Sequence, residues 1–172
     1  GSAEVEVAAA ARTLAVGSYT ARLQVNNQTT GGRLVLPVTL RILNPVGPVT
    51  EAGVVNAASF APGPIAPGEI VTIFGAGIGP ATLANLQLTA DRRVMTTLAD
   101  TRVLFNGIAA PLIYVQERQL SAIVPYGVQG RSRVDLQIEY LGFRSNTVSV
   151  AVATAAPGLF TLNSTGRGPG AV

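Results

Sequence analysis

The sequence predicts an all-β sandwich that is preceded by a second, partial β segment. Several stretches alternate apolar and polar residues with a period of two, which is typical of strands with one buried face. Turn signals rich in Gly, Pro and Asn separate these stretches at intervals of about 8–12 residues. No long stretch has helical periodicity, and "PATLANLQL" at 80–88 has room for two helical turns at most.

The clearest strand is "RVDLQIEY" at 133–140, in which every apolar residue falls at an even position. Residues 19–26 and 33–42 alternate in the same way, and the valines at 148, 150 and 152 mark a last strand. Pro37 indicates an edge position, because proline cannot donate a ladder hydrogen bond. The alternation predicts a sandwich core lined by Val71, Ile73, Phe105, Leu120, Ile123, Val134, Leu136, Ile138, Val148 and Val150.

The segments between the strands carry turn residues. Asn106-Gly107 separates "TRVLF" from "IAAPLIYV" and predicts a tight hairpin, since both residues tolerate positive φ. The stretch "NQTTGG" at 27–32 predicts the connection between the two N-terminal strands, and "LGF" at 141–143 predicts another turn. These signals support successive antiparallel strands.

The composition argues against most catalytic chemistry. The chain has 172 residues with no Cys and no His, and its twelve basic residues are all Arg. The chain therefore lacks the imidazole that best transfers protons near neutral pH, the thiolate that ligates metals and the amine that forms Schiff bases. A net charge of +3 without a basic block predicts no nucleic-acid partner. No apolar run approaches the ~20 residues of a membrane helix, so no membrane insertion is expected.

The stretch "IVTIFGAGIGPA" at 70–81 is similar to a dinucleotide-binding turn but departs from it. Gly75 and Gly77 fit a G-x-G-x-x-G pattern, whereas Pro80 stands where the third glycine belongs. No βαβ unit follows. We expect the three glycines at 75, 77 and 79 to serve a loop that needs positive φ or close backbone approach, and we expect no cofactor.

Few side chains are candidates for a site, and we expect no catalytic residue and no metal ligand. Asp135 and Glu139 share a strand face, but four strand residues separate them by about 13 Å, beyond the roughly 5–9.5 Å of a glycosidase pair. Tyr19 and Tyr140 fall with the apolar faces and are expected in the core. Tyr126, in the turn "VPYGV", is the one candidate ligand contact, as a platform on which a sugar stacks.

Three motifs in order carry a family resemblance: "VNAASFAPGPIAPGEIVTIFGAGIGPA", "TRVLFNGIAAPLIYVQERQLSAIVPYGV" and "SNTVSVAVATAAPGLFT". Together they resemble an IPT/TIG-type immunoglobulin-like domain. More closely, they resemble the uncharacterised C-terminal domain of secreted acidobacterial (Solibacter-type) proteins. The resemblance implies an extracellular accessory or structural module. Residues 1–43 resemble the closing hairpin of another bacterial immunoglobulin-like domain.

The chain is therefore expected to contain a partial immunoglobulin-like β segment at 1–43, a Pro/Gly linker at 44–53, an IPT/TIG-like sandwich at 54–154 and a Gly/Pro-rich tail at 155–172. The tail is expected to be loose unless something holds it. The partial segment needs a cover for its apolar face. The residues predicted for that interface are Tyr19, Leu23, Val25, Leu34, Leu36, Val38 and Leu40.

These expectations favour a non-catalytic extracellular module that forms a surface filament or assembly with copies of itself. Unpaired strand edges are templates for strand addition, so neighbouring subunits would complete each other head to tail. The alternative is a carbohydrate-binding or spacer module of a larger secreted protein, with surface glycans as partners.

Overall fold

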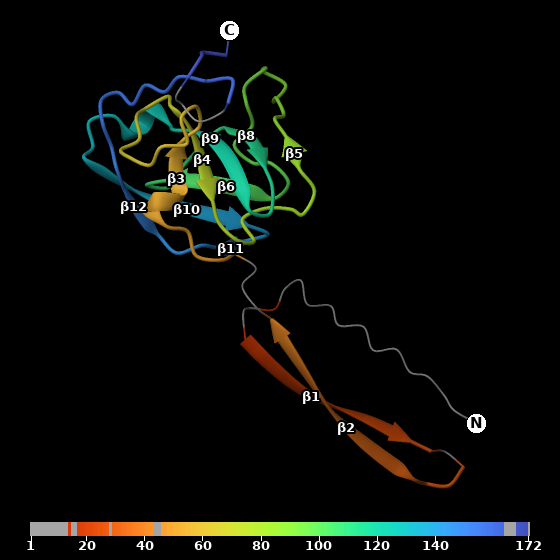
Figure 1. Ribbon diagram of the computed structural model, residues 1–172. Coiled ribbons are helices and arrows are strands. Elements are labelled where there is room, and N and C mark those ends of the chain that lie inside the picture. The colour runs from red at the N-terminus through yellow and green to blue at the C-terminus, as the bar shows by residue number, and fades with distance from the viewer. Residues whose placement is uncertain (1–13, 15–16, 28, 43–45, 164–167, 172) are drawn as a thin grey trace. The chain divides into compact units, whose positions relative to one another are not determined.

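The computed structural model describes residues 14, 17–27, 29–42, 46–163 and 168–171. The chain divides into two compact units, Gly1–Asn44 and Pro45–Val172. The described residues of both units consist of strands, short 3-10 turns and loops, which confirms the all-β fold class (Figure 1). No helix among these residues is long and apolar enough to cross a membrane.

The first unit contains a two-stranded antiparallel hairpin, β1 (Gly17–Asn26) and β2 (Arg33–Ile42). Its turn lies where the sequence predicts it, with Gly31 at φ +70° and Asn27 Oδ1 accepting hydrogen bonds from the backbone N–H groups of Thr29 and Thr30. Pro37 lies opposite Arg22, in a strand that has β1 as its one described partner. The edge position predicted for this proline is confirmed.

The second unit is an immunoglobulin-like sandwich of two antiparallel sheets (Figure 1). In the described part of the chain, the first sheet has the order β3-β4-β9-β8-β5. Its strands are β3 (Val54–Asn56), β4 (Ile70–Phe74), β5 (Ala84–Asn85), β8 (Leu112–Val115) and β9 (Gln119–Ile123). A register shift between Leu112 and Tyr114 marks a bulge in the β8–β9 pairing.

The second sheet is centred on β10, which pairs with β6 on one side and with β11 and β12 on the other. Its strands are β6 (Thr101–Phe105), β7 (Ile108–Ala109), β10 (Arg133–Tyr140), β11 (Phe143–Arg144) and β12 (Val148–Ala151). The turn between β6 and β7 has φ of +48° at Asn106 and +79° at Gly107, as the Asn-Gly signal predicts. The chain then crosses from this sheet to β8 in the other one.

Side chains from both sheets form one core. Of the ten predicted core residues, nine are buried. Ile123 is the exception, since it is only half-buried. In β9 the residues that point inward are Leu120 and Ala122, and Val124 continues the alternation, so the prediction for Ile123 was wrong by one position.

The predicted linker at 44–53 is also corrected, because its described residues 46–53 pack onto the sandwich. Val46 and Val49 belong to the core cluster. The Val49 N–H donates to Asn146 Oδ1 at 2.8 Å, and Asn146 Nδ2 donates to the Val49 carbonyl at 2.9 Å. The 3-10 turn η2 (Glu51–Gly53) leads directly into β3. Residues 46–53 are therefore part of the sandwich unit and do not form a separate linker.

The glycine-rich loop after β4 has the backbone features expected of it. Gly77 has φ +64°, and a Cβ at Gly79 would lie 2.8 Å from the Gln116 carbonyl oxygen. The next residues, 80–88, contain the short strand β5 and no helix. The loop thus brings the backbone close to the segment between β8 and β9.

Candidate functional site

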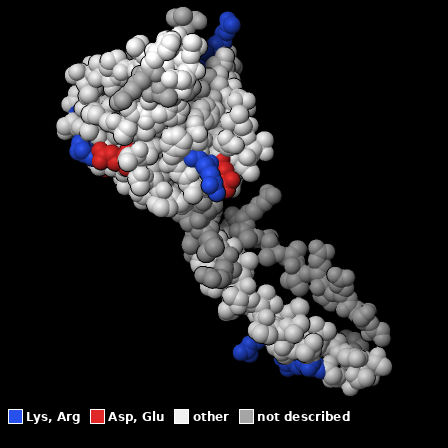
Figure 2. Space-filling model, in the orientation of Figure 1, with Lys and Arg blue, Asp and Glu red and all other residues white. Residues whose placement is uncertain are grey.

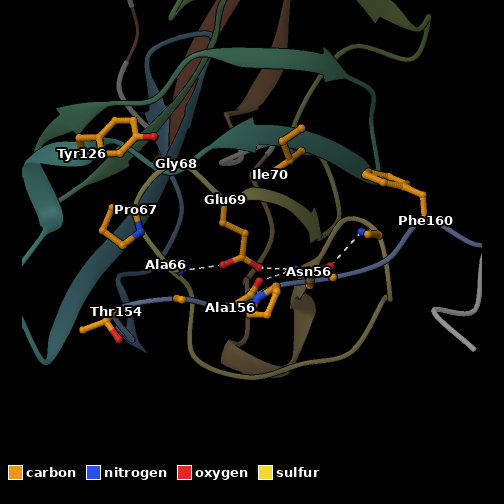
Figure 3. Close-up of a pocket in the computed structure, with 14 residues that line it drawn as sticks. Asn56, Ala66, Pro67, Gly68, Glu69, Ile70, Tyr126, Thr154, Ala156 and Phe160 are labelled. Carbon is orange, nitrogen blue, oxygen red and sulfur yellow. Dashed lines mark hydrogen bonds between the residues drawn. The ribbon is translucent and has the colours of Figure 1, made fainter.

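The end of β3 organises one corner of the sandwich through Asn56. Its Oδ1 accepts hydrogen bonds from the backbone N–H groups of Ala58 at 3.0 Å and Ser59 at 3.1 Å, which fixes an Asx-type turn. Its Nδ2 donates to Glu69 Oε1 at 2.7 Å and to the Ala156 carbonyl at 3.2 Å (Figure 3). One amide therefore joins the end of β3 to Glu69, thirteen positions later, and to the C-terminal segment, a hundred positions later.

Glu69, which precedes β4, lies half-buried in the same corner. Its Oε2 accepts a hydrogen bond from the Ala66 N–H at 2.7 Å, and its Oε1 accepts from Asn56 (Figure 3). Burial raises the pKa of the Glu69 carboxyl above its ordinary value, although the hydrogen bonds from Ala66 and Asn56 act in the opposite direction. Both carboxyl oxygens already have donors within the chain, which favours a structural role for this group.

The C-terminal segment is held at this corner instead of being loose. Ala156 accepts the Asn56 bond, and a Cβ at Gly158 would overlap the Asn56 side chain, so only glycine lets the segment lie so close. Farther on, the Leu162 N–H donates to the Pro169 carbonyl at 3.1 Å and the Ala171 N–H donates to the Phe160 carbonyl at 2.9 Å. The described part of the predicted tail is thus ordered by Asn56 and by its own pairing.

Tyr126 opens the 3-10 turn η3 (Tyr126–Val128) and is 73% exposed. Its ring lies over Gly68, which has φ +80°, and a Cβ there would lie 2.6 Å from the tyrosine oxygen. The absence of a side chain at Gly68 therefore lets the ring occupy this position. The structure places the predicted ligand contact on the surface, clear of the core.

Two hollows flank the Tyr126 ring. The first, of about 370 Å³, is lined by the Asn56–Glu69 corner together with Ile70 and Phe160 (Figure 3). The second, of about 450 Å³, is lined by Gln129, Arg131, Ser132 and neighbouring backbone. Pro67, Tyr126 and Thr154 line both. We name the second hollow the Arg131 hollow.

Other charged groups form ion pairs on the sandwich, in which Glu139 is half-buried and its arginine partners are exposed. Glu139 contacts Arg102 at 3.5 Å and Arg144 at 4.0 Å, and Arg133 contacts Glu51 at 2.9 Å. Figure 2 shows blue side chains beside red ones on the sandwich. Within the described ranges, no cluster of three or more His, Cys, Asp or Glu side chains is placed to hold a metal ion.

The predicted interface residues of the hairpin share one face. The register pairs Tyr19 with Leu40, Ala21 with Val38, Leu23 with Leu36 and Val25 with Leu34. Val25, Leu34, Leu36 and Val38 are between 37% and 56% exposed, whereas Tyr19, Leu23 and Leu40 are half-buried. We name this surface the apolar hairpin face.

The chain matches no family model, and no curated protein is significantly similar to it. The sequence reasoning singled out Tyr126 and the hairpin face but missed the Asn56–Glu69 corner. An Asn followed by small residues in "VNAAS" was a signal for the local turn. Nothing local indicated that residues about a hundred positions later would meet the same amide.

Proposed function

We propose that this protein is a non-catalytic structural module of the cell exterior whose hairpin joins it to further copies of the same chain. The observation that carries the proposal is the exposed apolar hairpin face. Isolated two-stranded hairpins are marginally stable at best in water, so this face needs a cover. The resemblance to IPT/TIG-type domains of secreted proteins supports the extracellular location.

The edges of the two units differ in the way that the proposal requires. Each hairpin strand has ten residues and a single described partner, so each leaves a long open edge. The outer strands of the sandwich are short, with three residues in β3, two in β5, β7 and β11, and four in β12, and Pro62 bridges to β3 from outside. The hairpin is therefore the better template for strand addition.

A second copy of the hairpin fits this surface by its distribution of charge. The register places Arg22 and Arg33 on the face opposite the apolar one, so two copies can pack apolar face to apolar face with these charges pointing away. A face of ten residue pairs covers on the order of 300 Å² in plan, less than the ~800 Å² per partner of a standard interface. Strand addition along the open edges would supply the remaining contact area.

The test is light scattering during size-exclusion chromatography of the full chain at micromolar concentration. We expect species larger than the monomer, and we expect a variant without residues 1–43 to be a folded monomer. A folded monomer of the full chain would refute self-assembly and favour the alternative, a spacer module whose hairpin another segment of a longer protein covers. Assembly that survives the deletion would place the contact on the sandwich.

A matched pair of substitutions locates the contact on one face. Leu36 and Val35 are neighbours with exposed fractions of 42% and 41%, but the register places them on opposite faces. We expect Leu36→Asp to weaken association at least about tenfold, because it puts a charge in the apolar contact. Val35→Asp should leave association within about threefold of the wild type. Equal effects of the two substitutions would contradict the proposed interface.

A further inference from the structure

We propose that the Arg131 hollow and the Tyr126 ring form a binding site for an acidic oligosaccharide, one whose sugar units carry carboxylates. The inference is independent of self-assembly, because it concerns a surface of the sandwich. The Arg131 hollow has a volume of about 450 Å³, which is in the range of small-molecule sites. Three features of the lining select the ligand class.

The first feature is a set of exposed polar side chains that line the hollow and have no protein partner in the described part of the chain. In the described ranges, no hydrogen bond or ion pair is made by the side chains of Tyr126, Gln129, Arg131, Ser132 or Thr154, all of which line the hollow. Three other arginines, Arg102, Arg133 and Arg144, each pair with a carboxylate, so their guanidinium groups are already engaged. Hydroxyl and amide groups of this kind can exchange hydrogen bonds with sugar hydroxyls.

The second feature is the charge of the hollow. Among the described residues that line this hollow, Arg131 is the one charged residue, whereas in the adjoining first hollow both carboxyl oxygens of Glu69 already accept hydrogen bonds from the chain. A guanidinium binds a carboxylate through two parallel hydrogen bonds, a geometry that neutral sugars cannot use. This cation favours a uronic-acid unit over a neutral one.

The third feature is the aromatic ring between the two hollows. Tyr126 is 73% exposed and lines both hollows, so its ring is available to a ligand that reaches from one hollow into the other. The apolar face of a pyranose ring packs against an aromatic face, and the ring loses little conformational entropy because it rests on Gly68. Ile70 and Phe160 continue the apolar surface in the first hollow (Figure 3). The ligand is therefore longer than one sugar.

The probe is trigalacturonic acid, titrated into the full-length protein by isothermal titration calorimetry, with galactotriose and monomeric galacturonic acid as comparisons. We expect saturable binding of the acidic trimer with a dissociation constant on the order of 1 mM or below, as suits a shallow, open site. The monomer should bind at least about tenfold more weakly, and the neutral trimer should show no saturation.

Two variants and one control assign the site. Arg131→Gln and Tyr126→Ala should each weaken binding of the acidic trimer at least about tenfold. Arg118→Gln makes the same charge change at an exposed arginine outside the hollow and should leave binding unchanged. Circular dichroism spectra that match the wild type would show that the variants fold.

Several results would overturn the proposal. One is an absence of saturation with the acidic trimer up to about 10 mM, because any remaining affinity would then be below the range of a built site. Another is an equal loss of affinity for the acidic trimer in Arg118→Gln and Arg131→Gln. Tight binding of triglutamate that survives Tyr126→Ala would also refute the saccharide assignment and indicate an acidic peptide. Binding of galactotriose as tight as that of the acidic trimer would refute the role of Arg131.

Discussion

Strands β1 and β10 have the same pattern in the sequence and different surroundings in the fold. Both alternate with a period of two, and both registers put the apolar residues on one face. In β10, Val134, Leu136 and Ile138 are at most 1% exposed, whereas Val25 of β1 is 39% exposed. The first sheet of the sandwich covers β10, and no described part of the hairpin's own unit covers β1. Alternation therefore predicts which residues share a face. Whether that face is buried depends on a second layer of structure, which the local pattern does not predict.

The largest expected effect is on the covered face. Ile138→Ala removes a fully buried side chain from the core, and we expect the free energy of unfolding to fall by about 2–5 kcal/mol from lost burial and the cavity left behind. Leu36→Ala changes a side chain that is 42% exposed and should cost less than about 1 kcal/mol in dilute monomer. Urea denaturation followed by circular dichroism measures both.

The two variants also show how the comparison can fail. A loss below about 1 kcal/mol for Ile138→Ala would mean that the register of β10 is misassigned. A loss above about 2 kcal/mol for Leu36→Ala in dilute monomer would mean that the hairpin face is already covered within one chain. The second result would remove the reason for assembly.

A smaller effect is expected at the Asn56 corner, which holds the C-terminal segment through polar contacts. Asn56→Ala removes the bonds to Glu69 and Ala156 and both bonds of the Asx-type turn, and we expect a loss of roughly 2–3 kcal/mol. Limited proteolysis should then cut the segment after residue 154 faster. Asn85→Ala, at an exposed position of β5, is the control and should change neither quantity. Unchanged proteolysis in Asn56→Ala would mean that other contacts hold the segment.

The sequence was sufficient for the parts of the fold that depend on neighbouring residues. The strands at 33–42 and 133–140, the Asn106-Gly107 turn and the close-approach glycines follow from periodicity and allowed φ. The errors arose where distant segments decide the outcome. Val49 looked like part of a linker because its partner, Asn146, is about a hundred residues away.

The candidate site was predicted only in part for the same reason. Tyr126 was identified from its place in a turn, and the structure adds that Gly68 and two hollows surround it. The charged and polar lining of the Arg131 hollow comes from loop residues 129–132 and 152–154, which carry no motif. Their convergence is a property of the packed sandwich and has no counterpart in local spacing.

The smallest expected effect is a pH dependence of the free energy of unfolding, which the Asn56 corner should contribute through Glu69 and the apolar core should not. Burial raises the pKa of Glu69 above its ordinary value of 4.5, so the folded state binds this proton more tightly than the unfolded state does. The stability that Glu69 contributes is fully present below the unfolded pKa and is lost as the pH rises through the folded pKa.

In Glu69→Gln this titration is absent, and the amide has one acceptor oxygen for the two donors at Ala66 and Asn56. We therefore expect the stability advantage of the wild type over Glu69→Gln to shrink as the pH rises above about 4.5, and to level off once the folded carboxyl has ionised. Urea denaturation of both proteins between about pH 4 and pH 8 measures this difference, and Glu117→Gln, at an exposed glutamate, corrects for the change in net charge. An advantage that grows with pH would show that the two hydrogen bonds outweigh burial and hold Glu69 as a stabilising carboxylate.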